Sequence, residues 1–259
     1  DELMKTVSDP KGKSSDELLN EAEAKIFELS ENRSKIDSLK KIEEFVGTTL
    51  DKLEELSKKQ GELIGSSSGF KAIDGVTQGL QDEDLIVIAG RPSMGKTSLA
   101  MNIAENISKN DDGCVAVFSL EMSSQSLTSR MLASMAGISQ SNVKTGNLTD
   151  RQWEKLIQQA KKLEEMNIFI DDTPNISPMD IRAKSRRLAK QYRKQGGVKL
   201  VVVDYIQLMQ MPGRTENRVN ELSEISRALK YLAKEINAPV IVLSQLNRAV
   251  EQRPNKRPQ

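Results

Sequence analysis

One eight-residue segment constrains the fold of this chain more than any other. The segment GRPSMGKT, residues 90–97, matches the phosphate-binding pattern GxxxxGK[ST] at every defined position. It follows the apolar run LIVIA, residues 85–89, and precedes an amphipathic stretch, so it has the strand–loop–helix context that the pattern requires. A glycine-rich turn without chemical meaning is the alternative, and the full match disfavours it. The sequence therefore predicts a phosphate-binding loop.

The residues of this loop have separate expected tasks. Its glycines let backbone N–H groups turn toward phosphate oxygens, and the following helix N-terminus adds partial positive charge. Lys96 is expected to reach the β- and γ-phosphates, and the Thr97 hydroxyl is expected to ligate Mg²⁺. The predicted nucleotide-binding residues are Gly90, Arg91, Pro92, Ser93, Met94, Gly95, Lys96, Thr97 and Ser98.

Further apolar runs indicate the rest of a sheet. They span residues 114–120, 167–170, 199–209 and 239–246. Consecutive rather than alternate apolar positions are typical of parallel strands covered on both faces. Helical stretches separate the runs, and two begin with capping signals, Thr149 with Gln152 and Ser177 with Asp180. The alternation predicts an α/β fold, a mostly parallel central sheet flanked by helices and joined by right-handed crossovers.

Acidic residues follow several of these runs. Asp204 ends KLVVVD and is the candidate to support Mg²⁺, because open α/β sheets collect ligands at the carboxyl ends of their strands. Glu121 follows VFSL and is the candidate to orient or deprotonate the attacking water. Each acid alone could be a solvated strand end. Asp171 and Asp172 compete with them but rank lower, since DDTPN is typical of a turn capped by side-chain oxygens.

The types of residue present limit the kinds of catalytic or metal site that the chain can form. The chain has no histidine and one cysteine, Cys114, which excludes a disulfide or a Cys/His zinc site within the chain and leaves carboxylates, lysines and a metal. Gln245 interrupts the last apolar run and either senses the γ-phosphate or is an ordinary satisfied polar group. No run approaches the ~20 apolar residues of a membrane span and no signal peptide is visible, so a cytoplasmic location without membrane contact is expected.

The first 65 residues differ in composition from the rest, because they are rich in charged residues and lack long apolar runs. A helix over residues 14–31 is predicted, starting with Ser14 and Glu17 in capping-box register. It either covers its own domain or docks on a neighbouring subunit. A second helix is predicted over residues 39–59, before the link GELIGSSSG. The apolar stripes are Leu18, Ala22, Ile26 and Leu29 in the first helix, and Leu39, Ile42, Val46, Leu50, Leu53 and Leu56 in the second.

Several ordered blocks together resemble one known family. GLQDEDLIVIAGRPSMGKTSLAMNIA, VFSLEMSSQSLTSRM, KLVVVDYIQLM, ENRVNELSEISRALKYLAKE and PVIVLSQLNRAVEQRPNKRP are similar to the RecA-type motor domain of the DnaB family of bacterial replicative helicases. The resemblance covers residues 61–259. It implies three parts: residues 1–36 as the end of an N-terminal domain with its linker helix, 37–65 as a helix and link, and 66–259 as a RecA-like P-loop ATPase motor.

The resemblance implies a function and roles for individual residues. The family forms a hexameric ring around single-stranded DNA, hydrolyses ATP with Mg²⁺ between subunits and unwinds duplex DNA 5′ to 3′ at the replication fork. By position, Lys96, Thr97, Glu121, Arg130, Asp204 and Gln245 become the catalytic and metal-binding set. Arg214 and Arg218, in a segment that faces the family's channel, become candidates for DNA phosphate contacts, although solvated loop charge also explains them.

The resemblance also implies partners and missing parts. Primase and a helicase loader are expected partners, and the linker helix is expected to dock on the next subunit. In the family, the segment after KRP continues into strands carrying an arginine finger, so a motor truncated at Gln259 is expected to be weak or inactive alone. Two alternatives stay open: a nucleotide-gated assembly module and a RecA-fold recombination ATPase.

Overall fold

The computed structural model describes residues 41–58, 63–210 and 218–246. The chain divides into two compact units, residues 1–61 and 62–259. The predicted helix over residues 14–31 and Arg214 lie outside the described residues.

The first unit contributes one described helix, α3 (Glu43–Lys58), which falls inside the predicted span of residues 39–59. Its apolar positions Val46, Leu50 and Leu53 are 48%, 60% and 56% exposed. Of the predicted stripe, these three positions lie on α3 with exposed side chains, whereas Leu39 and the side chain of Leu56 lie outside what the structure describes.

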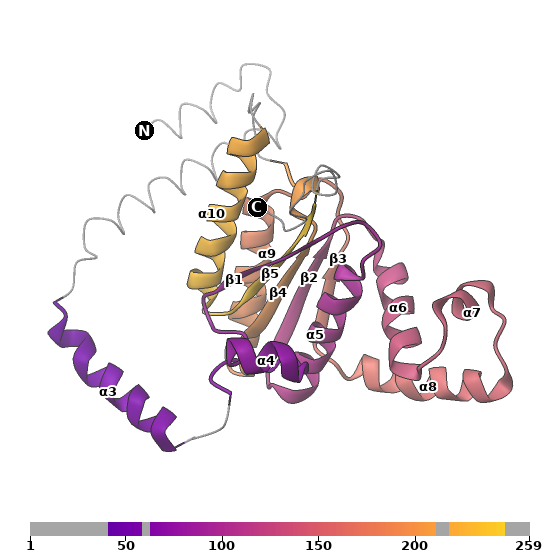
Figure 1. The fold of residues 1–259 in the computed structure, drawn as a ribbon, viewed down its shortest axis with the longest axis horizontal. Helices are drawn as coiled ribbons and strands as arrows, with labels where there is room; N and C mark the ends of the chain where they lie inside the picture. Colours follow the sequence, from indigo (N-terminus) through magenta and orange to yellow (C-terminus); the bar gives the residue numbers. More distant parts are fainter. Residues whose placement is uncertain (1–40, 59–62, 211–217, 247–259) are drawn as a thin grey trace, which may run out of the picture. The chain divides into compact units, whose positions relative to one another are not determined.

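The second unit is built on a parallel five-stranded sheet (Figure 1). The strands are β1 (Leu85–Gly90), β2 (Cys114–Ser119), β3 (Ile168–Asp171), β4 (Val198–Asp204) and β5 (Val240–Gln245). Their order in the sheet is β1-β5-β4-β2-β3, and every neighbouring pair is parallel. The predicted α/β class with a parallel central sheet is confirmed.

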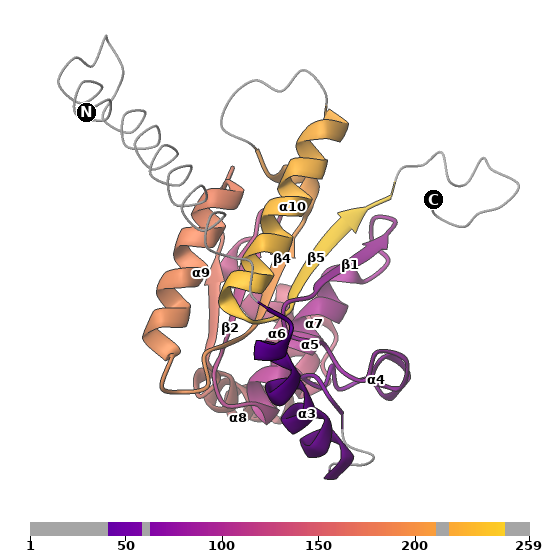
Figure 2. The same cartoon turned by 90° about the vertical axis from the view of Figure 1, so that its left-hand side faces the viewer.

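Helices join and cover the strands. They are α4 (Lys71–Thr77), α5 (Lys96–Asn110), α6 (Ser124–Ala136), α7 (Gln140–Thr145), α8 (Asp150–Glu164), α9 (Pro178–Tyr192), the 3₁₀ turn η1 (Ile206–Leu208) and α10 (Arg218–Ile236). Both predicted capping boxes are present, Thr149 with Gln152 at α8 and Ser177 with Asp180 at α9. α9 and α10 lie side by side on one face of the sheet (Figure 2), and α5 covers the other.

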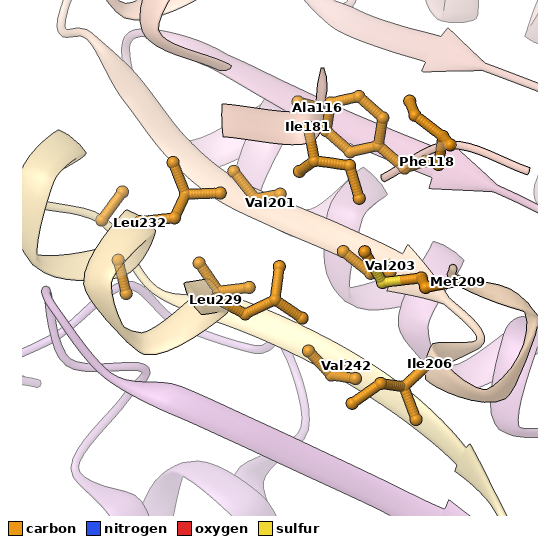
Figure 3. Packing of buried hydrophobic residues seen from close by; sticks show 14 of the residues in the cluster. Ala116, Phe118, Ile181, Val201, Val203, Ile206, Met209, Leu229, Leu232 and Val242 are labelled. Carbon is orange, nitrogen blue, oxygen red and sulfur yellow. The ribbon is translucent and has the colours of Figure 1, made fainter. Parts of the chain in front are cut away.

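Two buried clusters hold these layers together, one on each face of the sheet. On the first face, Ile181 of α9 and Leu229 and Leu232 of α10 pack on Val201 and Val242 (Figure 3). On the second, residues of α5 and α6 pack on the alternate side chains of the same strands, such as Val202 and Ile241. Burial of both faces explains why the central strands are apolar at consecutive positions.

The expectation that every strand is covered on both faces is wrong for the two edge strands. In β1, Val87 is 58% exposed, and in β3, Phe169 is 40% exposed. Strands at the edge have a neighbour on one side only, so their flanking helices do not cover them fully. The phosphate loop therefore follows an edge strand of the described sheet and not a buried one.

The described part of the predicted link, residues 63–69, makes backbone contacts within the second unit. Ser66 and Leu80 form a backbone bridge, and Gly65 donates its N–H to the carbonyl of Gln78. A Cβ on Gly65 would lie 2.2 Å from the Leu80 carbonyl oxygen, so only glycine fits this approach. The unit boundary after Gly61 thus lies within the segment predicted as a link, before the predicted motor start at residue 66.

None of the helices in the described residues combines the length and apolar character needed to cross a bilayer.

Candidate nucleotide-hydrolysis site

The phosphate loop runs from the end of β1 to the start of α5. Ser93 has φ 62° and Gly95, the N-cap of α5, has φ 83°, so the backbone turns sharply twice before the helix. The Lys96 ammonium donates hydrogen bonds of 3.0 Å to the carbonyls of Gly90 and Arg91. A Cβ on Gly90 would lie 3.3 Å from the Lys96 side chain. The lysine therefore lies folded against its own loop, in space that glycine leaves open.

Asp204 and the loop meet through one hydrogen bond between distant parts of the chain. The Thr97 hydroxyl donates to Oδ2 of Asp204 at 2.8 Å, across 107 residues of sequence. Asp204 is the last residue of β4 and is 3% exposed. Burial raises the pKa of its carboxyl group and outweighs the opposing hydrogen bond from Thr97. The pair thus places two hard oxygen ligands next to each other in a site that disfavours an isolated negative charge.

A cavity of about 300 Å³ opens above this pair. Its lining residues are Pro92, Ser93, Gly95, Lys96, Thr97, Ser98, Glu121, Met122, Arg130, Asp204, Tyr205 and Gln245. The structure therefore brings the six residues Lys96, Thr97, Glu121, Arg130, Asp204 and Gln245 to one hollow. Gly90, Arg91 and Met94 belong to the loop but do not line the cavity.

Glu121 and Arg130 reach the cavity from the segment after β2. Glu121 follows that strand by two residues, and Arg130 lies on α6, which Ser123 caps by accepting from the N–H of Ser126. Glu121 raises and Arg130 lowers the pKa of Asp204, after the larger effects of burial and the Thr97 hydrogen bond. The buried Nε of Arg130 has no hydrogen-bond partner among the described residues. An unsatisfied guanidinium nitrogen is a donor suited to an anion, and Arg130 is one of the residues that line the cavity.

The competing acids Asp171 and Asp172 make structural contacts in this protein and lie away from the cavity. Asp171 pairs with Lys184 and accepts the backbone N–H of Thr173. Burial raises the pKa of Asp171, but hydrogen bonds from Lys184 and Thr173 outweigh it, so the net shift is downward. Asp172 accepts the N–H of Ser124 at the start of α6 at 2.8 Å. Neither acid lines the cavity, which agrees with their lower rank.

Gln245 and Arg218 have different surroundings. Gln245 lines the cavity at the end of β5. Arg218, at the start of α10, donates to the carbonyls of Gln207 and Met209 at 2.6 and 3.1 Å and pairs with Glu221. Its guanidinium is thus engaged with the chain, while its side chain remains 43% exposed.

Two residues of the site have no counterpart in the predictions. Tyr205 lines the cavity, and burial together with the nearby Glu121 and Asp204 raises the pKa of its hydroxyl. Gln207 contacts the backbone of Gln245. Both sit in the segment DYIQLM, where polar groups inside an apolar run were the available signal.

The donor set fits a magnesium ion held jointly with phosphate. No cluster of three or more acidic, histidine or cysteine residues suited to a metal occurs among the described residues. Thr97 and Asp204 supply only two oxygens, and Mg²⁺ in phosphate-binding proteins commonly takes its other ligands from phosphate and water.

Comparisons with known proteins converge on one family. Residues 65–259 match the family described as DnaB-like helicase C terminal domain. The chain is 48% identical over 244 residues to the replicative DNA helicase DnaB of Geobacillus stearothermophilus, an alignment covering 94% of this chain and 53% of that protein. It is 44% identical over 244 residues to the replicative DNA helicase DnaC of Bacillus subtilis (strain 168), again covering 94% and 53%. The chain thus spans about half the length of these relatives.

Two solved structures are similar to this chain and support the same family. A structure described as an ATPase domain superposes with a TM-score of 0.77 at 36% identity, over 86% of this chain and 77% of that one. A DnaB-like replicative helicase, described with its interactions with primase, superposes with a TM-score of 0.74 at 36% identity, over 86% of this chain and 52% of that one.

Proposed function

This chain belongs to the DnaB-like helicases, and on that premise we propose that it hydrolyses ATP to move along single-stranded DNA and unwind duplex DNA at the replication fork. The observation that carries the proposal is the meeting of the Thr97 hydroxyl and the Asp204 carboxylate at 2.8 Å beside the phosphate loop. This pair joins the two elements that any nucleotide hydrolase of this class needs, a phosphate cradle and a metal-supporting acid.

Binding would begin at the loop. The backbone N–H groups after Gly90 and the N-terminus of α5 would hold the phosphates, with the Lys96 ammonium moving from its two carbonyl partners to phosphate oxygens. Thr97 and Asp204 would ligate Mg²⁺, which would neutralise charge on the phosphates as it develops. The raised pKa of Asp204 supports this assignment, because burial disfavours the negative charge of its carboxylate and a bound cation would offset that cost.

Hydrolysis would use the residues on the other side of the cavity. Glu121 would orient and deprotonate the attacking water, since it is the cavity acid that is not hydrogen-bonded to Thr97. Arg130 would donate its unsatisfied Nε to a phosphate oxygen. Gln245 would contact the γ-phosphate from the end of β5.

The proposal extends to assembly and location. A hexameric ring, docking of residues 14–31 on the next subunit, travel in the 5′ to 3′ direction, a helicase loader and a cytoplasmic location follow from the family. Primase is proposed as a partner because a related structure is described by its interactions with primase. Arg214 and Arg218 are proposed as contacts to DNA phosphates; the hydrogen bonds of Arg218 to Gln207 and Met209 leave its side chain 43% exposed for such a role.

The test is a Glu121→Gln variant of the full protein, assayed for ADP binding, for phosphate release with and without single-stranded DNA, and for unwinding of a forked duplex. Glutamine keeps the size of Glu121 but is not a base, so turnover should fall by about 100-fold or more while ADP binding is retained. Wild-type protein should show DNA-stimulated phosphate release and unwinding. Unchanged turnover in the variant would refute the role of Glu121, and a wild-type protein that neither hydrolyses ATP nor unwinds DNA would refute the function.

A further inference from the structure

A polar network lies directly behind Gln245, where two strands stop pairing. β4 and β5 pair from Val201 with Val240 to Val203 with Val242, after which the chain leaves β4 and forms η1. β5 continues to Gln245 and keeps its pairing with β1 as far as Gly90. Among the described strands, the last residues of β5 therefore have a partner on one side only.

The side chain of Gln207 occupies the place of the missing strand. Its Oε1 accepts the N–H of Gln245 at 3.2 Å, and its Nε2 donates to the carbonyl of the same residue at 3.2 Å. Nε2 also donates to the hydroxyl of Ser244 at 2.9 Å. A side-chain amide thus satisfies both backbone groups of Gln245, as a neighbouring strand would.

The turn that carries Gln207 is itself fixed. Ile206 and Met209 are 8% and 0% exposed and belong to the core under α10. Arg218 holds the carbonyls of Gln207 and Met209 from the start of α10, and its pairing with the 12% exposed side chain of Glu221 orients the guanidinium. A rigid base of this kind restricts where the Gln207 amide lies, and hence where β5 ends.

We propose that Gln207 is a positioning residue that sets the place of Gln245 at the cavity and ties it, through its own carbonyl, to Arg218 on α10. The proposal rests on the proposed contact of Gln245 with the γ-phosphate. Loss of the Gln207 amide leaves the backbone groups of Gln245 without their partners, so the end of β5 shifts and its side chain no longer meets the γ-phosphate. Nucleotides that lack a γ-phosphate are unaffected.

The experiment is a titration of the full chain, with Mg²⁺, by ADP and by the non-hydrolysable analogue AMP-PNP. The variants are Gln207→Leu, Gln245→Ala, the double variant, and Gln191→Leu as a control. Leucine at position 207 keeps the volume of glutamine and removes all three hydrogen bonds. Gln191 is an exposed glutamine on α9. Gln191→Leu therefore makes the same glutamine-to-leucine change without removing the hydrogen bonds of Gln207.

Gln207→Leu should lower the preference for AMP-PNP over ADP by about fivefold, or ~1 kcal/mol, with ADP affinity unchanged. The double variant should lose no more than Gln245→Ala alone, because one residue acts through the other. A preference unchanged in Gln207→Leu, losses that add in the double variant, or a parallel fall in ADP affinity would overturn the positioning role. So would a wild-type protein that does not distinguish the two nucleotides.

These measurements need neither turnover nor DNA. A wild-type protein that prefers AMP-PNP but shows no DNA-stimulated hydrolysis would refute the proposed helicase function and leave the role of Gln207 standing.

Discussion

Replacing Asp204 with asparagine is expected to stabilise the nucleotide-free protein while abolishing hydrolysis. Asp204 is 3% exposed, and burial raises the pKa of its carboxyl group above the ordinary value of 3.8. A carboxyl whose pKa is higher in the folded than in the unfolded state binds more protons when folded, so its ionisation costs stability as pH rises through that window. Asparagine carries no charge and keeps an oxygen that can accept the Thr97 hydroxyl.

The expected gain in the free energy of unfolding comes from the loss of one buried charge. Removing one destabilising buried charge should add about 1 kcal/mol, within the ~0.5–2 kcal/mol common for such substitutions. For a domain of this size, ~1 kcal/mol corresponds to a Tm increase of about 2–4 °C. The gain should be full above the raised pKa of Asp204 and should vanish as pH falls below 3.8, where the wild-type carboxyl is protonated in both states.

Thermal unfolding followed by circular dichroism, from about pH 8 down to about pH 3, measures this dependence. Asp112→Asn, at an exposed acid after α5, is the matched control and should leave Tm unchanged. Addition of Mg²⁺ and ADP should raise the Tm of the wild type more than that of Asp204→Asn, because only the wild type offers the carboxylate. A variant that melts below the wild type without nucleotide, or a gain independent of pH, would refute the reasoning.

Two further changes test the scaffold. Gly65→Ala should lower the free energy of unfolding by about 1–3 kcal/mol in denaturant titrations, because its Cβ would meet the Leu80 carbonyl oxygen at 2.2 Å. Gly47→Ala in α3, where nothing lies within 4 Å, is the control and should add about 0.5–1 kcal/mol of helix stability; equal effects would contradict the clash. Burial raises the pKa of the Cys114 thiol to about 12, so iodoacetamide at about pH 8 should label it only after denaturation. Rapid labelling of the native protein would show that the strand is not buried.

The strands and helix starts were predictable because each depends on local chemistry. Apolar runs located all five strands within a few residues, and Thr149 and Ser177 located two helix starts. The order of strands in the sheet is not a local property. The sequence alone therefore did not distinguish the edge strands, whose Val87 and Phe169 are exposed, from the central ones.

The site was predictable where a residue ends a strand. Asp204 and Gln245 end β4 and β5, Glu121 closely follows β2, and all three line the cavity. Gln207 was not predicted because it lies inside the apolar run of residues 199–209, in which nothing marked the 3₁₀ turn that follows Asp204. The hydrogen-bond partner of a polar side chain in such a turn depends on tertiary packing. The spacing of residues in a single sequence does not reveal that packing.

The position of β5 has a consequence for synthesis of the protein. Among the described strands it is the last in sequence, yet it lies between β1 and β4 in the sheet. A chain growing from the ribosome makes the phosphate loop long before the strand that joins β1 to β4, so we expect the Thr97–Asp204 hydrogen bond to form late in synthesis.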